Sequence, residues 1–74
     1  MEMFIEGLRK AFMQADSMDV ENQIIFNANE AVNKAYDNGK ITIDRLMKHI
    51  HDIADWGMQK TAMEVMNLPV KQQA

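Results

Sequence analysis

Residues 35–46 read AYDNGKITIDRL, and this stretch decides the fold because it interrupts a long run of helical periodicity. Asn38 and Gly39 both tolerate the left-handed backbone conformation that closes a helix. Thr42 can then cap a new helix with its hydroxyl oxygen. The stretch therefore predicts that one helix stops and another restarts, with a non-helical interruption at 38–41.

Apolar side chains recur every three or four residues on both sides of this interruption, which is the period of an amphipathic helix. Before it, the pattern predicts a helix from about residue 20 to 37, with apolar positions Ile24, Ile25, Ala28, Ala31, Val32, Ala35 and Tyr36. After it, a helix ends before Leu68-Pro69, with apolar positions Ile43, Leu46, Met47, Ile50, Ile53, Ala54, Met58, Ala62, Val65 and Met66. Residues 3–16 form a first helix, and Ser17 can cap the second.

These elements predict an all-α fold, a three-helix antiparallel bundle over residues 1–68 with a frayed tail at 69–74. The third helix is about 37 Å long, against about 21 and 27 Å for the other two. It therefore outruns its partners. Either Gly57 bends it back, or something else covers the apolar surface from Met58 to Met66.

The size of the chain limits the core that this domain can build. A chain of 74 residues buries on the order of 60% of the surface that it exposes when unfolded. That burial barely offsets the entropy lost on folding. The sequence has no cysteine, which excludes disulfides and thiolate zinc sites. We therefore expect self-association, most simply as a two-fold dimer through the C-terminal half of the third helix.

The charge and hydropathy of the chain bear on its surroundings. The formal net charge is −3, which disfavours general affinity for phosphate backbones and anionic membranes. The longest apolar runs are pairs and triplets, far short of the roughly 20 residues of a membrane-spanning helix. The N-terminus has no basic leader. We therefore expect a cytoplasmic protein.

Two motifs suggest metal binding, and both are weak. Residues 37–42 resemble the middle of a calcium-binding EF-hand loop, but Lys34 and Arg45 would occupy its first and twelfth positions, where calcium requires oxygen. His51 and Asp55 share a helix face, yet no third ligand is nearby in sequence. There is also no cysteine nucleophile or glycine-rich phosphate loop. We expect no metal, cofactor or catalytic group.

The interruption could also be the turn of a helix-turn-helix motif. Its second helix would then present four side chains to nucleic acid, namely Lys40, Arg45, Lys48 and His49. Three acidic residues dilute this face, namely Asp44, Asp52 and Asp55. A solvated face of mixed charge is the simpler interpretation, so nucleic-acid binding is the alternative hypothesis.

Some apolar side chains fit none of the core stripes. Phe26 lies among polar residues, and Trp56 and Met63 stack seven residues apart on the third helix. Trp and Met are enriched where proteins meet. Alternatively, Trp56 covers the open end of the bundle and the methionines only fill gaps. We expect a non-enzymatic protein-interaction module of regulatory, adaptor or inhibitor type, with a partner or dimer surface of Phe26, Trp56, Met58, Lys60, Met63 and Met66.

Overall fold

The computed structural model describes residues 1–66, in which the chain is helical apart from its connections and has no strand. The helices are α1 (Glu2–Gln14), α2 (Met18–Asp37) and α3 (Ile43–Met66). The all-α prediction is therefore confirmed. Leu68-Pro69 and the predicted tail at 69–74 lie outside the described residues. No helix in the described part of the chain combines the length and the apolar character needed to span a membrane.

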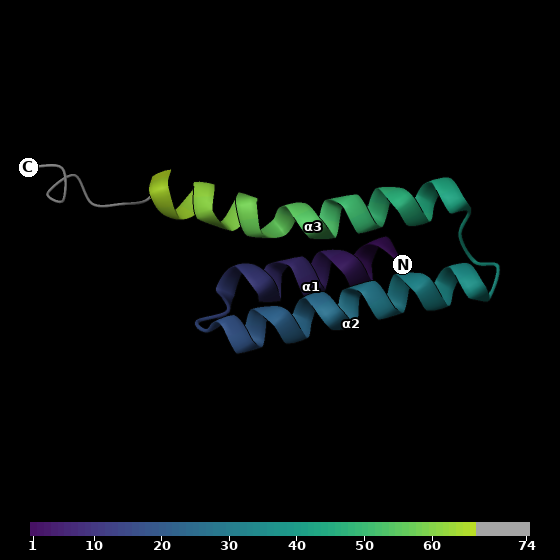
Figure 1. Cartoon of the computed structure of the whole chain (residues 1–74), viewed down its shortest axis with the longest axis horizontal. Helices are drawn as coiled ribbons and strands as arrows, with labels where there is room; N and C mark the ends of the chain where they lie inside the picture. The colour runs from purple at the N-terminus through teal and green to yellow at the C-terminus, as the bar shows by residue number, and fades with distance from the viewer. Residues whose placement is uncertain (67–74) are drawn as a thin grey trace, which may run out of the picture.

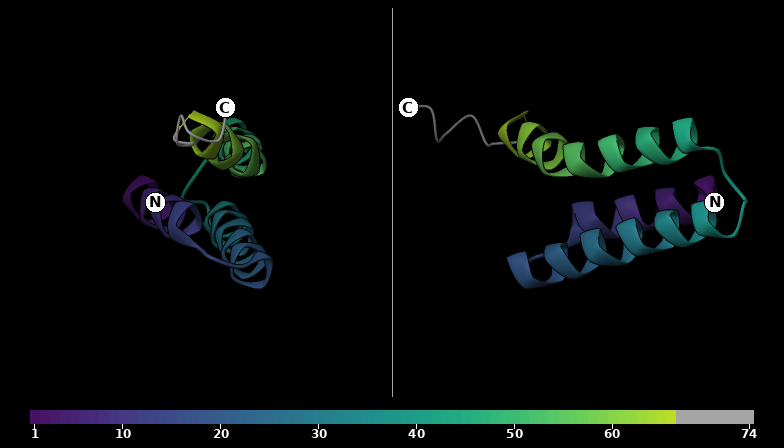
Figure 2. Two further views of the ribbon diagram at one scale, coloured as in Figure 1. Left: turned by 90° about the vertical axis from the view of Figure 1, so that its left-hand side faces the viewer. Right: turned by 45° about the vertical axis from the view of Figure 1, so that its right-hand side comes forward.

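The chain runs along α1, returns along α2 and runs out again along α3 (Figure 1). The contacts of α3 with α1 show that these two helices run in the same direction. Arg45, near the start of α3, pairs with Glu2 at the start of α1, and Lys60, near the end of α3, binds the carbonyl oxygen of Ala15. Seen end on, the helices occupy the corners of a triangle (Figure 2). The starts of α1 and α3 therefore share one end of the molecule.

Local hydrogen bonds form at the capping residues that the sequence predicted, although α1 ends at Gln14 instead of residue 16 and α2 begins at Met18 instead of about residue 20. The backbone N–H of Val20 donates to the hydroxyl of Ser17 at 3.2 Å. At Gly39 the backbone is left-handed, with φ of 72°, and Lys40 N–H donates back to the carbonyl of Ala35. These are features of a Schellman-type helix end. The hydroxyl of Thr42 then caps α3 by accepting from Arg45 N–H at 3.2 Å. The predicted interruption between the second and third helices is confirmed.

The core lies along the axis of the triangle and draws on all of the helices. Its buried hydrophobic members are Ile5, Phe12, Ala28, Val32, Ala35, Leu46, Ile53 and Trp56. Two of the α2 members are alanines, which let the neighbouring helices approach closely. Six half-buried side chains pack around the core, namely Leu8, Met13, Ile24, Ile25, Ile41 and Ile50. Hydrophobic burial of this set holds the helices together.

The third helix extends beyond the other two, as the sequence predicted. It has 24 residues, against 13 in α1 and 20 in α2, and its yellow end projects past both neighbours in Figure 1. Every residue from 61 to 66 is exposed. α3 continues through Gly57, and residues 61–66 stay exposed, so the helix does not fold back at Gly57 to cover its own apolar surface.

Candidate functional site

Two apolar stripes run along α3, and only one of them faces the core. Successive residues of an α-helix are about 100° apart around its axis. The buried residues of α3 therefore form one stripe, which we call the inner stripe and which comprises Leu46, His49, Ile53 and Trp56. A second row, about 120° around the helix, comprises Ile43, Met47, Ile50, Ala54, Met58 and Val65. We call it the outer stripe.

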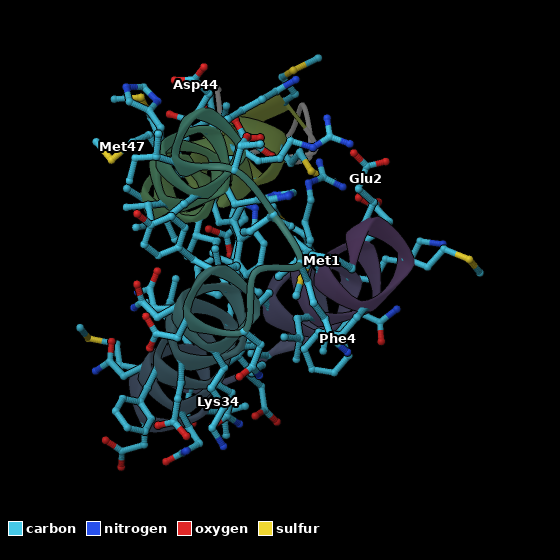
Figure 3. The ribbon with its side chains drawn as sticks, turned by 90° about the vertical axis from the view of Figure 1, so that its right-hand side faces the viewer. Met1, Glu2, Phe4, Lys34, Asp44 and Met47 are labelled. Carbon is cyan, nitrogen blue, oxygen red and sulfur yellow. The ribbon has the colours of Figure 1, made fainter. Side chains whose placement is uncertain are left out.

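The outer stripe is largely exposed. Met58 is 74% exposed, and Val65, Met47 and Ile43 are 61%, 59% and 51% exposed. Figure 3 shows Met47 on the side of α3 that faces away from α1, whereas Glu2 lies on the opposite side of the molecule. Ile50 is half-buried against the core, so the stripe borders the core along one edge. A row of exposed apolar residues along a whole helix is unusual, whereas single exposed ones are ordinary.

No charged side chain interrupts the outer stripe. From Ile43 to Val65, the positions that recur every three or four residues along the stripe are occupied by apolar residues and by Thr61. The ionisable residues of α3 lie to its sides, among them Asp44, which stands beside Met47 in Figure 3. Depletion of charge with enrichment in methionine is the composition of the buried centre of a protein interface.

Trp56 is not part of an exposed surface, and its assignment to the partner surface was wrong. It is 1% exposed, and its ring lies 5.8 Å from that of Phe12, centroid to centroid, at an angle of 48°. The reason is its spacing. Trp56 follows Ile53 by three residues and His49 by seven, which places it on the inner stripe. The alternative that Trp56 belongs to the bundle itself is the one that the structure supports.

Lys60 also serves the fold, which corrects its assignment to the partner surface. Its side chain is 11% exposed. The ammonium group donates to the carbonyl of Ala15 at 2.6 Å and to the carboxylate of Glu21. It also lies 5.5 Å from the ring centroid of Phe12. Lys60 therefore ties α3 to the connection between α1 and α2 and is not available to a partner.

The remaining members of the predicted surface are exposed but do not form one patch with Trp56. Met66 is 83% exposed, and Met63, seven residues after Trp56, continues the inner stripe past the end of the core and is 46% exposed. Phe26 is 59% exposed and borders a shallow hollow whose other lining residues all belong to α2, namely Asn29, Glu30, Asn33, Lys34 and Asp37. Met58 belongs to the outer stripe.

The predicted nucleic-acid face loses one of its four members to the core. His49 is 8% exposed and belongs to the inner stripe, and among residues 1–66 its Nε2 atom has no hydrogen-bond partner. Arg45 pairs with the carboxylate of Glu2 at 2.9 Å, and its side chain remains 51% exposed. Lys40 and Lys48 are exposed. An open hollow of about 740 Å³ lies between the starts of α1 and α3, lined by Met1, Glu2, Met3, Lys40, Ile41, Thr42, Arg45 and His49. Glu2 places a negative charge within it.

The weak metal motif of His51 and Asp55 gains no further ligand in the fold. Within residues 1–66 no three His, Asp or Glu side chains come close enough together to hold a metal ion. Asp55 instead accepts a hydrogen bond from the amide of Gln59 at 3.3 Å. Residues 37–42, which resembled part of an EF-hand loop, form the turn and cap between α2 and α3.

Comparison with protein-family models, with characterised proteins and with solved structures gives no match to this chain. Its function is therefore inferred from its own surfaces.

Proposed function

We propose that this protein is a non-enzymatic protein-interaction module, a three-helix antiparallel bundle that acts in the cytoplasm as a regulator, adaptor or inhibitor. The contact surface is the outer stripe of α3. One observation carries the proposal: an uncharged apolar row runs the length of α3, and all of its large side chains except Ile50 stay exposed. Burying such a row against a helix of a partner releases the water on both surfaces.

The chemistry of the outer stripe fits a helical partner. Its residues recur at three- and four-residue spacing, which is the spacing at which one helix meets the ridges of another. Met47 and Met58 have flexible thioether side chains that adapt to the shape of the surface they meet. The stripe lies on a regular helix that is already formed, so binding requires little ordering of this chain.

Capture from cells tests the proposed function. A tagged chain is compared with Met47→Glu and Met58→Glu, each of which places a charge in the stripe, and with Met3→Glu as the matched control. Met3 is 90% exposed on α1, so its replacement repeats the chemistry elsewhere. We expect a partner that is retained by the parent chain and Met3→Glu and is depleted at least tenfold by both stripe variants. Equal capture by all four chains contradicts the proposal.

A further inference from the structure

The spacing of the outer stripe is the same in both directions along α3. Including Thr61, its positions are 43, 47, 50, 54, 58, 61 and 65, separated by 4, 3, 4, 4, 3 and 4 residues. Ala54 stands at the centre. Ile43, Ala54 and Val65 recur every 11 residues, a period of about 3.67 residues per turn that keeps the row nearly straight along the helix. A second copy turned end for end therefore presents the same pattern in register.

We propose that the partner of this surface is a second copy of the same chain, with the two α3 helices antiparallel and a two-fold axis at Ala54. The proposal rests on the proposed function and names the partner for the same surface. Around the axis, Ile50 shares a layer with Met58 of the partner subunit. Towards the ends, Met47 meets Thr61 of the partner subunit and Ile43 meets Val65 of the partner subunit. The two-fold axis repeats each of these contacts, so both chains bury the same large apolar residues of the outer stripe.

The small residue at the axis suits this arrangement. Two helices pack with their axes 8–10 Å apart, and small side chains at the crossing point favour the lower end of that range. Ala54 is exposed, and the alanine of one chain comes against the alanine of the other. The larger side chains on either side then reach across to the partner helix.

The charges beside the stripe are compatible with the same axis. His51 and Asp55 lie on one flank of the outer stripe, about 60° and about 100° from its centre line. The two-fold axis brings each His51 near Asp55 of the partner subunit, once on each side of the centre. The stripe itself carries no charge, so no ionised group lies at the centre of the contact.

The dimer also covers the part of α3 that projects beyond its own bundle. Residues 61–66 are exposed in one chain. In the antiparallel pair, they lie alongside the first turns of the partner subunit's α3, over residues 42–47. The long third helix thereby has a neighbour along the outer side of its whole length. A helical partner of unrelated sequence would need neither the symmetric spacing nor alanine at its centre.

Cysteine cross-linking tests both the partner and its direction, because the natural chain has no cysteine. Ile43→Cys and Val65→Cys are made separately, mixed under mild oxidation and analysed by mass spectrometry. A disulfide requires Cα atoms within about 7 Å. In the proposed dimer position 43 faces position 65 of the other chain, whereas the two 43 positions are about 33 Å apart. We expect the mixed pair to cross-link and Ile43→Cys alone to give at least tenfold less product.

Three results overturn the proposal. One is cross-linking of Ile43→Cys with itself at the rate of the mixed pair, which indicates parallel helices. Another is mixed cross-linking that Met58→Glu in both chains leaves unchanged, since that contact does not use the outer stripe. The last is sedimentation of the parent chain as a monomer up to about 300 µM, because a dimer with a micromolar dissociation constant would be formed at that concentration. If cellular capture still depends on Met47 and Met58 in that case, the interaction function stands and only the second copy is wrong.

Discussion

Replacing Trp56 tests whether the inner stripe of α3, unlike the outer stripe, contributes to the free energy of unfolding of the single chain. Trp56 is 1% exposed and packs against Phe12 with the two rings tilted. Truncating a buried aromatic residue to alanine costs about 3–5 kcal/mol, because the transfer energy is lost and a cavity remains. A folded chain of 74 residues has a total stability of about 4–11 kcal/mol. Trp56→Ala should therefore remove about a quarter of it or more.

The matched substitution is Met58→Ala on the outer stripe. Met58 is 74% exposed in the single chain, so its replacement should change the free energy of unfolding by less than about 0.5 kcal/mol when the chain is dilute. For a domain of this size each kcal/mol shifts Tm by about 4–8 °C. We therefore expect Tm to fall by about 12 °C or more in Trp56→Ala and to change little in Met58→Ala.

Urea unfolding followed by far-ultraviolet circular dichroism at about 1 µM measures both effects, since dilution removes any contribution from self-association. Repeating the measurement at higher protein concentration should leave the deficit of Trp56→Ala unchanged but should reveal one for Met58→Ala. A loss below about 1 kcal/mol in Trp56→Ala would refute the placement of this side chain in the core.

Further predictions follow from the turn, the cap and the cationic residues. Gly39→Ala should destabilise the fold by about 1–2 kcal/mol in urea unfolding, because the φ of Gly39 is 72°. Gly57→Ala should instead stabilise α3 by about 0.5–1 kcal/mol, since a methyl group there meets nothing within 4 Å. Changes of the same sign in the two variants would contradict this reasoning. Thr42→Ala should cost about 0.5–2 kcal/mol by removing the cap on Arg45 N–H, and an unchanged unfolding midpoint would show that the hydroxyl is dispensable. Titration with duplex DNA at physiological salt should show no specific, salt-sensitive binding, because Glu2 places a negative charge beside Arg45 and the net charge is −3. Sub-micromolar binding that Arg45→Ala and Lys48→Ala abolish would instead support the nucleic-acid alternative.

The helix boundaries could be predicted because local chemistry determines them. Gly39 needs no neighbour to favour a left-handed turn, and Ser17 and Thr42 cap the helices that directly follow them. The overhang of α3 also follows from sequence, since helix length is proportional to residue number.

The orientation of α3 could not be read as easily, because both of its stripes have helical periodicity. Grouping Met47 and Met58 with Leu46 and Ile53 merged two faces into one and left Trp56 outside it. His49 made the inner stripe hard to recognise, because histidine is counted as a polar residue in an apolar pattern, whereas His49 is only 8% exposed in the fold. The spacing of Trp56 did indicate its place, because it lies three residues after Ile53 and seven after His49, on the same face of the helix.

The ion pair of Lys60 with Glu21 had no signal in the sequence. The two residues are 39 positions apart and meet only because α3 passes the connection between α1 and α2. A lysine on an amphipathic helix ordinarily snorkels to solvent, so its partial burial depends on tertiary packing.

The methyl groups of the methionines test the central claim most directly, because they report on both the outer stripe and its controls in one sample. In ¹³C-methyl-methionine spectra recorded from about 10 to 500 µM, self-association moves only the methyl groups that enter the contact. Our account predicts concentration-dependent shifts for Met47 and Met58, with Met3 unchanged. Spectra in which no methyl group shifts, or in which Met3 shifts and the two stripe methionines do not, would contradict it.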